Sequence, residues 1–223
     1  MEQCIISRSF IDKMSENLNS KNIKKIDKHY VHKENNDYVL ISEIHEIPLE
    51  FLTDSALAKP KNHKFLYSIA LPKYDCLFCF DHELDHMPFI MAIELVRQAG
   101  IAIAHSIYNV PVAGYTNIMD NITVNMETFI ELDIPLIMII EDVLVKTRKS
   151  RQERKLRFYL FQKENLCATL DINASVMEKD IYSRLRLTSR GGMIKDTGLC
   201  KAPTTNLQML NTPYMNKVLM YND

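Results

Sequence analysis

Acidic and imidazole side chains crowd residues 80–88, immediately before a long apolar stretch. The ionisable members of this segment are Asp81, His82, Glu83, Asp85 and His86. Imidazole and carboxylate groups are the usual general bases of enzymes, and the free N–H groups at a helix start can stabilise a developing oxyanion. A thioester carbonyl placed there would be held by the amides of Phe89 and Ile90. The alternative is a polar loop that caps the helix, with Asp85 or its neighbours accepting from those N–H groups.

Residues 82–86 also match the H-E-x-x-H pattern of zinc hydrolases, in which two histidines on one helix face bind the metal. The pattern requires a continuous helix, but the ring of Pro88 would clash with the carbonyl group of Leu84 in such a helix. Downstream, Glu94 is too close to be a convincing third ligand. A zinc hydrolase is therefore a remote alternative, and the main prediction includes no metal and no cofactor.

A second set of polar residues lies on the apolar stretch itself. At helical spacing these side chains share one face: Glu94, Arg97, Gln98, Ile101 and His105. Charged groups are costly to bury unless they are paired, so Glu94 and Arg97 can simply neutralise each other. The alternative is that this face lines a pocket. Burial would then raise the pKa of Glu94 toward the range that suits acid–base catalysis, and Arg97 would oppose that shift.

The apolar stretch predicts one long helix over residues 88–108. Pro88 suits the first turn, where its missing N–H needs no partner. Apolar residues at steps of three and four predict a stripe that faces the core: Phe89, Ile93, Val96, Gly100, Ile103 and Ile107. Further apolar residues beside the stripe predict that a sheet covers the helix on most sides.

Strand patterns flank this helix. They are predicted at 38–44 and 65–71 before it, and at 122–126, 134–145, 156–160 and 168–176 after it. The connections are too short for crossover helices, so the sheet is expected to be antiparallel. The fold class is therefore α+β: a curved antiparallel sheet wrapped around one central helix, the hotdog fold. We expect a polar N-terminal arm (1–30), a single hotdog domain (31–183) and an irregular C-terminal tail (184–223).

The basic run at residues 146–157 lies between two predicted strands. Such a run is usually a solvated hairpin tip, although its positive potential would also suit an acidic partner. Cys76 and Cys79 form a lone C-x-x-C in an apolar context, which favours core cysteines over a metal or redox site.

Composition limits the remaining function classes. The chain has 223 residues, of which 47% are hydrophobic and 25% charged, and its net charge is −1. A nucleic-acid binder would show a basic excess, so no nucleic-acid partner is expected. The longest apolar stretch is interrupted by Glu94 and Arg97, which favours a buried helix over a membrane span. The five scattered cysteines form no disulfide framework, and a cytoplasmic location is expected.

Several blocks, in order, resemble the A-factor biosynthesis hotdog family. The helix carries the core of the resemblance in residues 94–100, followed by Ala104-His105 and Val110-Pro111. Upstream, residues 31–33 and 38–41 are similar to the opening motif of the family, and Asp81-His82, Asp85-His86 and Pro88 are similar to its aspartate–histidine approach to the helix. Phe89 stands where the family usually has glycine. Leu95-Val96 stands where the family usually has a small pair.

The resemblance implies an acyltransferase that makes γ-butyrolactone-type signals. A β-ketoacyl group would pass from an acyl-carrier-protein or coenzyme A thioester to a hydroxyl of a small phosphorylated acceptor such as dihydroxyacetone phosphate. Glu94 or His82 would be the catalytic base, Arg97 and Gln98 would orient the acyl carbonyl or the phosphate, and Asp81, Asp85, His86 and His105 would support the pocket. The family often carries two hotdog units, so this single unit is expected to form a homodimer. A hotdog thioesterase or dehydratase, or a non-catalytic acyl or carrier-protein binding module, is the alternative.

Overall fold

The computed structural model describes residues 5–18, 23–73, 85–148 and 150–189. The chain divides into two compact units, Met1–Tyr182 and Ser183–Asp223. Within the second unit, only the residues up to Ser189 are described, and they belong to helix α4 (Lys179–Ser189). The segment that begins at residue 184, expected to be irregular, is therefore helical as far as Ser189.

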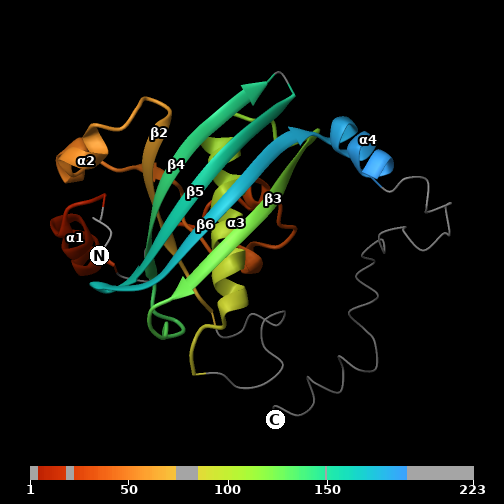
Figure 1. The fold of residues 1–223 in the computed structure, drawn as a ribbon. Coiled ribbons are helices and arrows are strands. Elements are labelled where there is room, and N and C mark those ends of the chain that lie inside the picture. The colour runs from red at the N-terminus through yellow and green to blue at the C-terminus, as the bar shows by residue number, and fades with distance from the viewer. Residues whose placement is uncertain (1–4, 19–22, 74–84, 149, 190–223) are drawn as a thin grey trace, which may run out of the picture. The chain divides into compact units, whose positions relative to one another are not determined.

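The first unit contains one six-stranded antiparallel sheet (Figure 1). Its strands are β1 (His45–Glu46), β2 (His63–Ala70), β3 (Tyr115–Met126), β4 (Leu136–Arg148), β5 (Arg151–Gln162) and β6 (Asn165–Glu178). They lie in the order β1-β2-β4-β5-β6-β3, and every neighbouring pair is antiparallel. The predicted antiparallel sheet and α+β class are confirmed, including the strands expected from the alternating patterns.

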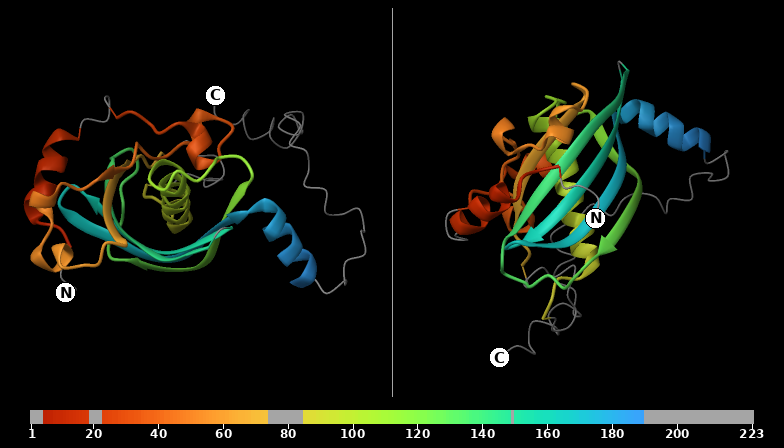
Figure 2. Two further views of the ribbon diagram at one scale, coloured as in Figure 1. Left: turned by 90° about the horizontal axis from the view of Figure 1, so that it is seen from above. Right: turned by 60° about the vertical axis from the view of Figure 1, so that its left-hand side comes forward.

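Helix α3 (Phe89–Ser106) lies in the hollow of this sheet, which curves around it (Figure 2). The helix is apolar enough and long enough to cross a bilayer, but 61% of it is buried inside the protein. Leu95, Val96, Ala99 and Ala102 are fully buried against the inner faces of β4, β5 and β6. The predicted hotdog arrangement is confirmed.

The predicted core stripe of the helix is partly wrong at its start. Phe89 is 60% exposed, whereas Met91, two positions later, is fully buried. Pro88 is the N-cap residue and not the first helical residue, with an extended ψ of 147°. The helix therefore begins one residue later than predicted. Val96 and Ile103 of the predicted stripe are fully buried, so the stripe holds in the middle of the helix and fails at Phe89.

The outer face of the sheet carries a second apolar cluster. Helix α1 (Arg8–Asn17) contributes Phe10 and Ile11, which pack with Ile137, Ile139 and other outward side chains of the sheet. The short helix α2 (Asp54–Leu57) and the 3-10 helix η4 (Leu49–Phe51) belong to the same layer. Part of the segment expected to be a polar arm thus buries apolar side chains on the sheet.

Residues 38–44 do not form the predicted strand. The 3-10 helices η2 (Lys28–Val31) and η3 (Asn36–Tyr38) precede an extended segment with only isolated bridges, Ile41 to Ala70 and Ser42 to Lys25. The β-branched pattern reflects burial here, because Val39, Leu40 and Ile41 are almost fully covered. They pack on the inner cluster with α3.

The basic run forms the expected hairpin between β4 and β5, and residues 146–148 are exposed, but the run is not solvated throughout. Most of the run is strand, because β4 ends at Arg148 and β5 begins at Arg151. Lys155 is exposed, but Arg154 is only 2% exposed and points toward the helix. Period-2 alternation explains this, since Arg154 shares the inner face of β5 with Leu156 and Phe158.

Candidate functional site

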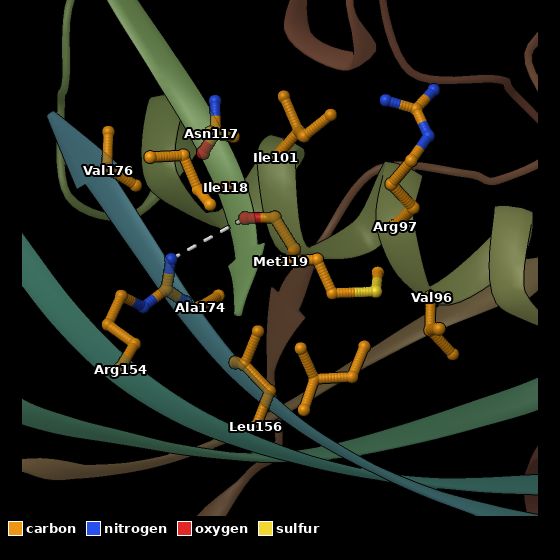
Figure 3. A pocket seen from close by; sticks show the side chains of 12 residues that line it. Val96, Arg97, Ile101, Asn117, Ile118, Met119, Arg154, Leu156, Ala174 and Val176 are labelled. Carbon is orange, nitrogen blue, oxygen red and sulfur yellow. Dashed lines mark hydrogen bonds between the residues drawn. The ribbon is translucent and has the colours of Figure 1, made fainter. Parts of the chain in front are cut away.

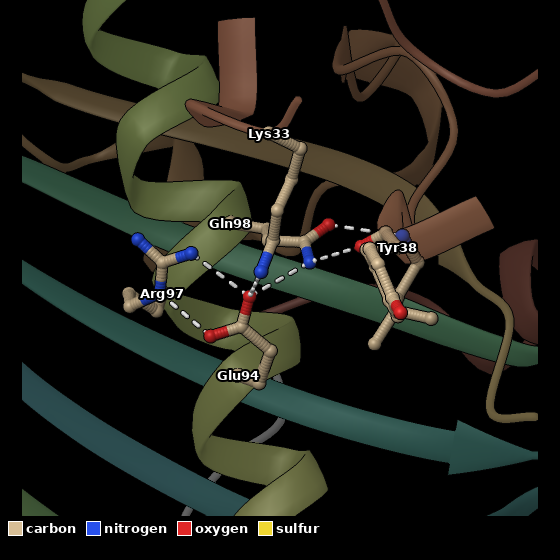
Figure 4. A network of polar contacts seen from close by, with 6 residues as sticks. Lys33, Tyr38, Glu94, Arg97 and Gln98 are labelled. Carbon is tan, nitrogen blue, oxygen red and sulfur yellow. Dashed lines mark hydrogen bonds and ion pairs between the residues drawn. The ribbon is translucent and has the colours of Figure 1, made fainter. Parts of the chain in front are cut away.

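Glu94 is the centre of a cluster of polar contacts on α3 (Figure 4). Arg97 donates to both of its carboxylate oxygens, from Nε to Oε2 at 2.6 Å and from Nη2 to Oε1 at 2.8 Å. Lys33 Nζ and Gln98 Nε2 each lie 2.8 Å from Oε1. The Glu94 side chain is 12% exposed. These four residues, hereafter the Glu94 cluster, confirm that the helical spacing brings Glu94, Arg97 and Gln98 together.

The ionisation of Glu94 differs from the expectation of a raised pKa. Burial alone raises the pKa of this carboxyl group, but hydrogen bonds from Arg97, Lys33 and Gln98 outweigh burial and lower the pKa to about 2. Donors to the charged form favour that form. The opposing effect of Arg97 therefore prevails over burial, and Glu94 is a carboxylate at neutral pH.

Lys33 is a member of the site that the residue types and spacing do not single out. It follows η2, and its ammonium group reaches Glu94 because Gln98 anchors the chain nearby. Gln98 Oε1 accepts from the Leu40 amide at 2.9 Å, and Gln98 Nε2 donates to the Tyr38 carbonyl at 2.8 Å. The only signal for Lys33 in the sequence is that residues 31–33 resemble the opening motif of the A-factor biosynthesis hotdog family.

His105 supports the opposite end of the helix. Its Nδ1 donates to the Val110 carbonyl at 2.7 Å, and its Nε2 lies 2.9 Å from Nε2 of His32. The Val110 carbonyl accepts only, so in a neutral His105 ring Nε2 carries the lone pair and accepts from His32. Tyr30 stacks on the His105 ring. At about 1.5 Å per residue His105 lies about 16 Å along the axis from Glu94, so it positions η2 and does not touch the Glu94 cluster.

The residues before the helix form a separate contact set. His86 Nδ1 lies 2.6 Å from Asp85 Oδ1, and the His86 ring packs on Phe129 at 5.0 Å between centroids. The Met87 amide donates to the Ile130 carbonyl at 2.7 Å, which fixes the chain just before Phe89. Asp81, His82, Glu83, Cys76 and Cys79 lie outside the described residues.

The start of α3 borders a wide cavity of about 620 Å³. The cavity is lined by His86, Met87, Pro88, Phe89 and residues 126–129. Ile90 is 45% exposed beside it. The first-turn amides of a helix have no intrahelical acceptor, so the expected oxyanion donors, Phe89 N–H and Ile90 N–H, lie at an accessible helix start.

The described residues offer no group of three or more His, Cys, Asp or Glu that would hold a metal ion. The H-E-x-x-H match lies mostly outside the described residues, and its last member, His86, precedes the helix. A zinc site would need both histidines on one helix face.

The A-factor biosynthesis hotdog domain matches residues 14–178, which is most of the chain and includes the whole Glu94 cluster. The chain belongs to this family. No curated protein matches the sequence. Residues 94–98 thus occupy the central helix of an A-factor biosynthesis hotdog domain.

Several solved structures of low sequence identity are similar to this chain. The dehydratase heterocomplex ApeI:P from Xenorhabdus doucetiae is 12% identical, with 71% of this chain and 95% of that chain covered and a TM-score of 0.46. A putative thioesterase, yhdA, from Lactococcus lactis is 11% identical, with coverage of 66% and 99% and a TM-score of 0.42. A 1,4-dihydroxy-2-naphthoyl-CoA thioesterase from Synechocystis is 9% identical, with coverage of 52% and 83% and a TM-score of 0.39.

Proposed function

We propose that this hotdog domain is an acyltransferase of the A-factor biosynthesis type. It would transfer a β-ketoacyl group from a carrier-protein or coenzyme A thioester to a hydroxyl of a small phosphorylated acceptor such as dihydroxyacetone phosphate. The observation that carries the proposal is the Glu94 cluster, in which a carboxylate and two cations are held on the central helix of this family's fold.

The charge of the cluster suits a phosphorylated acceptor. Glu94 carries one negative charge, and Arg97 and Lys33 carry two positive charges, so these three side chains together have a net charge of +1. The Lys33 side chain is 20% exposed and that of Arg97 is 36% exposed, which leaves both cations accessible to a ligand. Charge-assisted hydrogen bonds make Arg and Lys the usual partners of phosphate.

A bound phosphate would also activate Glu94. With both cations in place, its pKa of about 2 makes Glu94 a weak base. A phosphate that draws Lys33 or Arg97 toward itself removes a donor from the carboxylate and raises that pKa. Binding of the acceptor phosphate would thereby make Glu94 basic enough to deprotonate the hydroxyl group of the same acceptor.

The reaction then balances as a single acyl transfer. Glu94 takes the proton of the acceptor hydroxyl group. The hydroxyl oxygen of the acceptor bonds at the same time to the carbonyl carbon of the thioester. The carbon–sulfur bond breaks, and the thiolate leaves and receives the proton from Glu94. The amides of Phe89 and Ile90 would hold the intermediate oxyanion, and the roles of Asp81, His82, Asp85 and His86 remain predictions.

We further propose that the active form is a homodimer in the cytoplasm. Strand β3 pairs only with β6, so its other edge is open in the described chain. The strand has 12 residues and contains no Lys, Arg or Pro, the usual protection of an edge. Pairing of two β3 edges would join two sheets and restore the paired units that the family often carries in one chain. Light scattering on the purified protein tests the dimer.

A non-catalytic binding module is the second candidate. The observation that favours it is the saturation of Glu94 by three donors, together with Phe89 at the position where the family usually has glycine. In that case the hotdog would hold an acyl thioester without transferring it.

One incubation separates these functions. The protein is mixed with 3-oxoacyl thioesters of coenzyme A and of carrier-protein phosphopantetheine, in the presence of dihydroxyacetone phosphate, and products are followed by mass spectrometry. Phosphorylated ester supports the acyltransferase. Free acid without ester indicates a thioesterase, and thioester that is bound but unchanged indicates the binding module.

A further inference from the structure

Four large apolar side chains are exposed near the start of α3. Phe129 is 75% exposed and Met126 is 41% exposed, and Phe89 and Ile90 are exposed to a similar degree. Phe89, Met126 and Phe129 line the cavity of about 620 Å³, hereafter the helix-start cavity. Single exposed apolar residues are ordinary on a protein surface, but a group of them around one hollow indicates a binding surface.

Backbone hydrogen bonds fix both walls of the helix-start cavity. On one wall, the Met87 amide donates to the Ile130 carbonyl at 2.7 Å. On the other, the Glu127 amide donates to the Cys167 carbonyl at 2.8 Å. The cavity is therefore formed by segments that are anchored to the rest of the domain.

The lining of the helix-start cavity suits a neutral, apolar ligand. Its ionisable side chains are His86 and Glu127, and the described lining contains no Lys or Arg. His86 is already paired with Asp85. A phosphate or carboxylate in this cavity would lie near Glu127 without a free cationic partner, which is costly. Charge thus favours a hydrocarbon over an anionic group.

Two other cavities are less suitable for a long hydrocarbon chain. One, of about 100 Å³, lies between α3 and strands β3, β5 and β6, with Arg97 in its lining (Figure 3). A cavity of about 150 Å³ binds benzene, so this one holds about four carbons. The other, of about 440 Å³, is lined in part by the polar side chains of Gln162, Lys163 and Asn165. At the same space per carbon, the helix-start cavity has room for about ten carbons or more.

The helix-start cavity meets the candidate site at Phe89. The proposed function places the thioester carbonyl at the amides of Phe89 and Ile90, and the Phe89 side chain lines the cavity. The pantetheine arm of a thioester carries amide groups that are costly to bury without partners, whereas the acyl chain is hydrocarbon. Glu94 lies about 7.5 Å further along the helix axis. The acyl chain and the acceptor phosphate would therefore occupy different parts of the site.

We propose that the helix-start cavity binds the acyl chain of the thioester, and that the Phe89 and Phe129 side chains select chains of about eight carbons or more. The inference rests on the proposed action on acyl thioesters. It adds the length of the acyl chain. It also gives a role to Phe89, whose ring supplies an apolar wall that glycine, the usual residue of the family at this position, would lack.

The test measures the binding of coenzyme A analogues in which CH₂ replaces the thioester sulfur, so that no acyl group is transferred. Calorimetry on the full chain compares coenzyme A itself with the butyryl, hexanoyl and octanoyl analogues. A fully buried methylene group strengthens binding about fourfold. Because the lining side chains are partly exposed, we expect a smaller gain per methylene group, and at least about a tenfold gain from butyryl to octanoyl.

The double variant Phe89→Ala/Phe129→Ser removes both aromatic rings and keeps the backbone amides. It should reduce the gain from butyryl to octanoyl to less than about threefold and leave butyryl binding unchanged. Leu49→Ser is the matched control, because Leu49 is a 71% exposed apolar residue of η4 outside the cavity, and it should keep the full gain. Circular dichroism checks the fold of each variant. If the double variant does not fold, Phe129→Ser alone should give an intermediate gain.

The possible failures can be told apart. Equal binding of the butyryl and octanoyl analogues by the wild type overturns this inference and leaves the proposed function standing. A full gain in the folded double variant also overturns it, because the acyl chain then lies elsewhere. If that variant keeps the gain but loses dimerisation in light scattering, the cavity is an interface between two copies instead. If the wild type binds none of the analogues, the action on acyl thioesters fails and this inference fails with it.

Discussion

Arg97 holds both carboxylate oxygens of Glu94, with Nε to Oε2 at 2.6 Å and Nη2 to Oε1 at 2.8 Å. This bidentate contact fixes the carboxylate and leaves it ionised at neutral pH. A catalytic role for Glu94 then requires that the substrate loosen the contact. The chemistry of the site therefore depends on the cations around Glu94 as much as on Glu94 itself.

Lys33→Met should move the pH dependence of activity. Lys33 lowers the pKa of Glu94, so its removal raises that pKa and Glu94 becomes protonated at a higher pH. The acid limb of the rate profile for acyl transfer should shift upward in pH, and KM for the phosphorylated acceptor should rise. Lys64→Met, which removes a surface pair with Glu46, should leave the profile unchanged. Identical acid limbs in the wild type and Lys33→Met would contradict the proposed contact.

Gln98→Leu should destabilise the protein. The amide of fully buried Gln98 satisfies the Leu40 N–H and the Tyr38 carbonyl. Leucine leaves both groups without that partner, at a cost of roughly 2–5 kcal/mol in the free energy of unfolding. Urea unfolding measures the loss, with Asn125→Leu on the exposed part of β3 as the control. A change below about 0.5 kcal/mol, typical of surface sites, would show that Gln98 does not anchor this segment.

The contrast between Gln98 and Lys33 shows what the sequence predicts. Helical spacing is a local property, so the sequence alone places Glu94, Arg97 and Gln98 on one face. Lys33 reaches the same carboxylate from a segment distant in sequence, and that contact depends on tertiary packing. The burial of Arg154 is not predicted for a related reason. A run of basic residues indicates exposure to solvent, but the alternation of strand β5 points the Arg154 side chain toward the core.

Tertiary packing also explains why residues 38–44 do not form the predicted strand. Their β-branched character predicts a strand, but burial against α3 produces the same pattern without a regular ladder. Strands β3, β5 and β6 are predictable because their apolar residues alternate, and β4 because its apolar run is long. The two-residue strand β1 is too short to show a pattern. The fold thus follows from periodicity, whereas contacts between distant segments do not.

His32 should make stability depend on pH. Burial lowers its pKa below the usual 6.5, and the charges of His105, Arg97 and Lys179 lower it further. The unfolded chain then binds the proton more readily. The contribution of His32 to stability is complete above pH 6.5 and is lost as pH falls toward the lowered value.

His32→Asn is the matched variant for this effect. Asparagine tolerates the left-handed backbone of this position, φ 56°, and does not titrate. The free energy of unfolding, measured by urea between pH 8 and pH 5, should fall less steeply in His32→Asn than in the wild type. Parallel curves would show that His32 does not carry this pH dependence.

Gly100→Ala should not destabilise the protein. A Cβ at this position would lie 3.4 Å from Leu156 Cδ1, which is an ordinary van der Waals contact. Alanine favours a helix interior over glycine by about 1 kcal/mol, so thermal stability should be unchanged or slightly higher. Thermal unfolding measures the change, and a clear fall in the midpoint of Gly100→Ala would show that the helix packs more tightly at this position.

The most direct test of the account is the rate of ester formation by Glu94→Gln. Glutamine keeps the size of the side chain but cannot take the hydroxyl proton, and general-base catalysis typically contributes about 10²–10⁴-fold. Glu46→Gln, on the surface, is the control. With a 3-oxoacyl-coenzyme A and dihydroxyacetone phosphate, we predict at least about a 100-fold loss of single-turnover rate in Glu94→Gln, with thioester binding retained. A wild-type rate in folded Glu94→Gln would contradict the central claim.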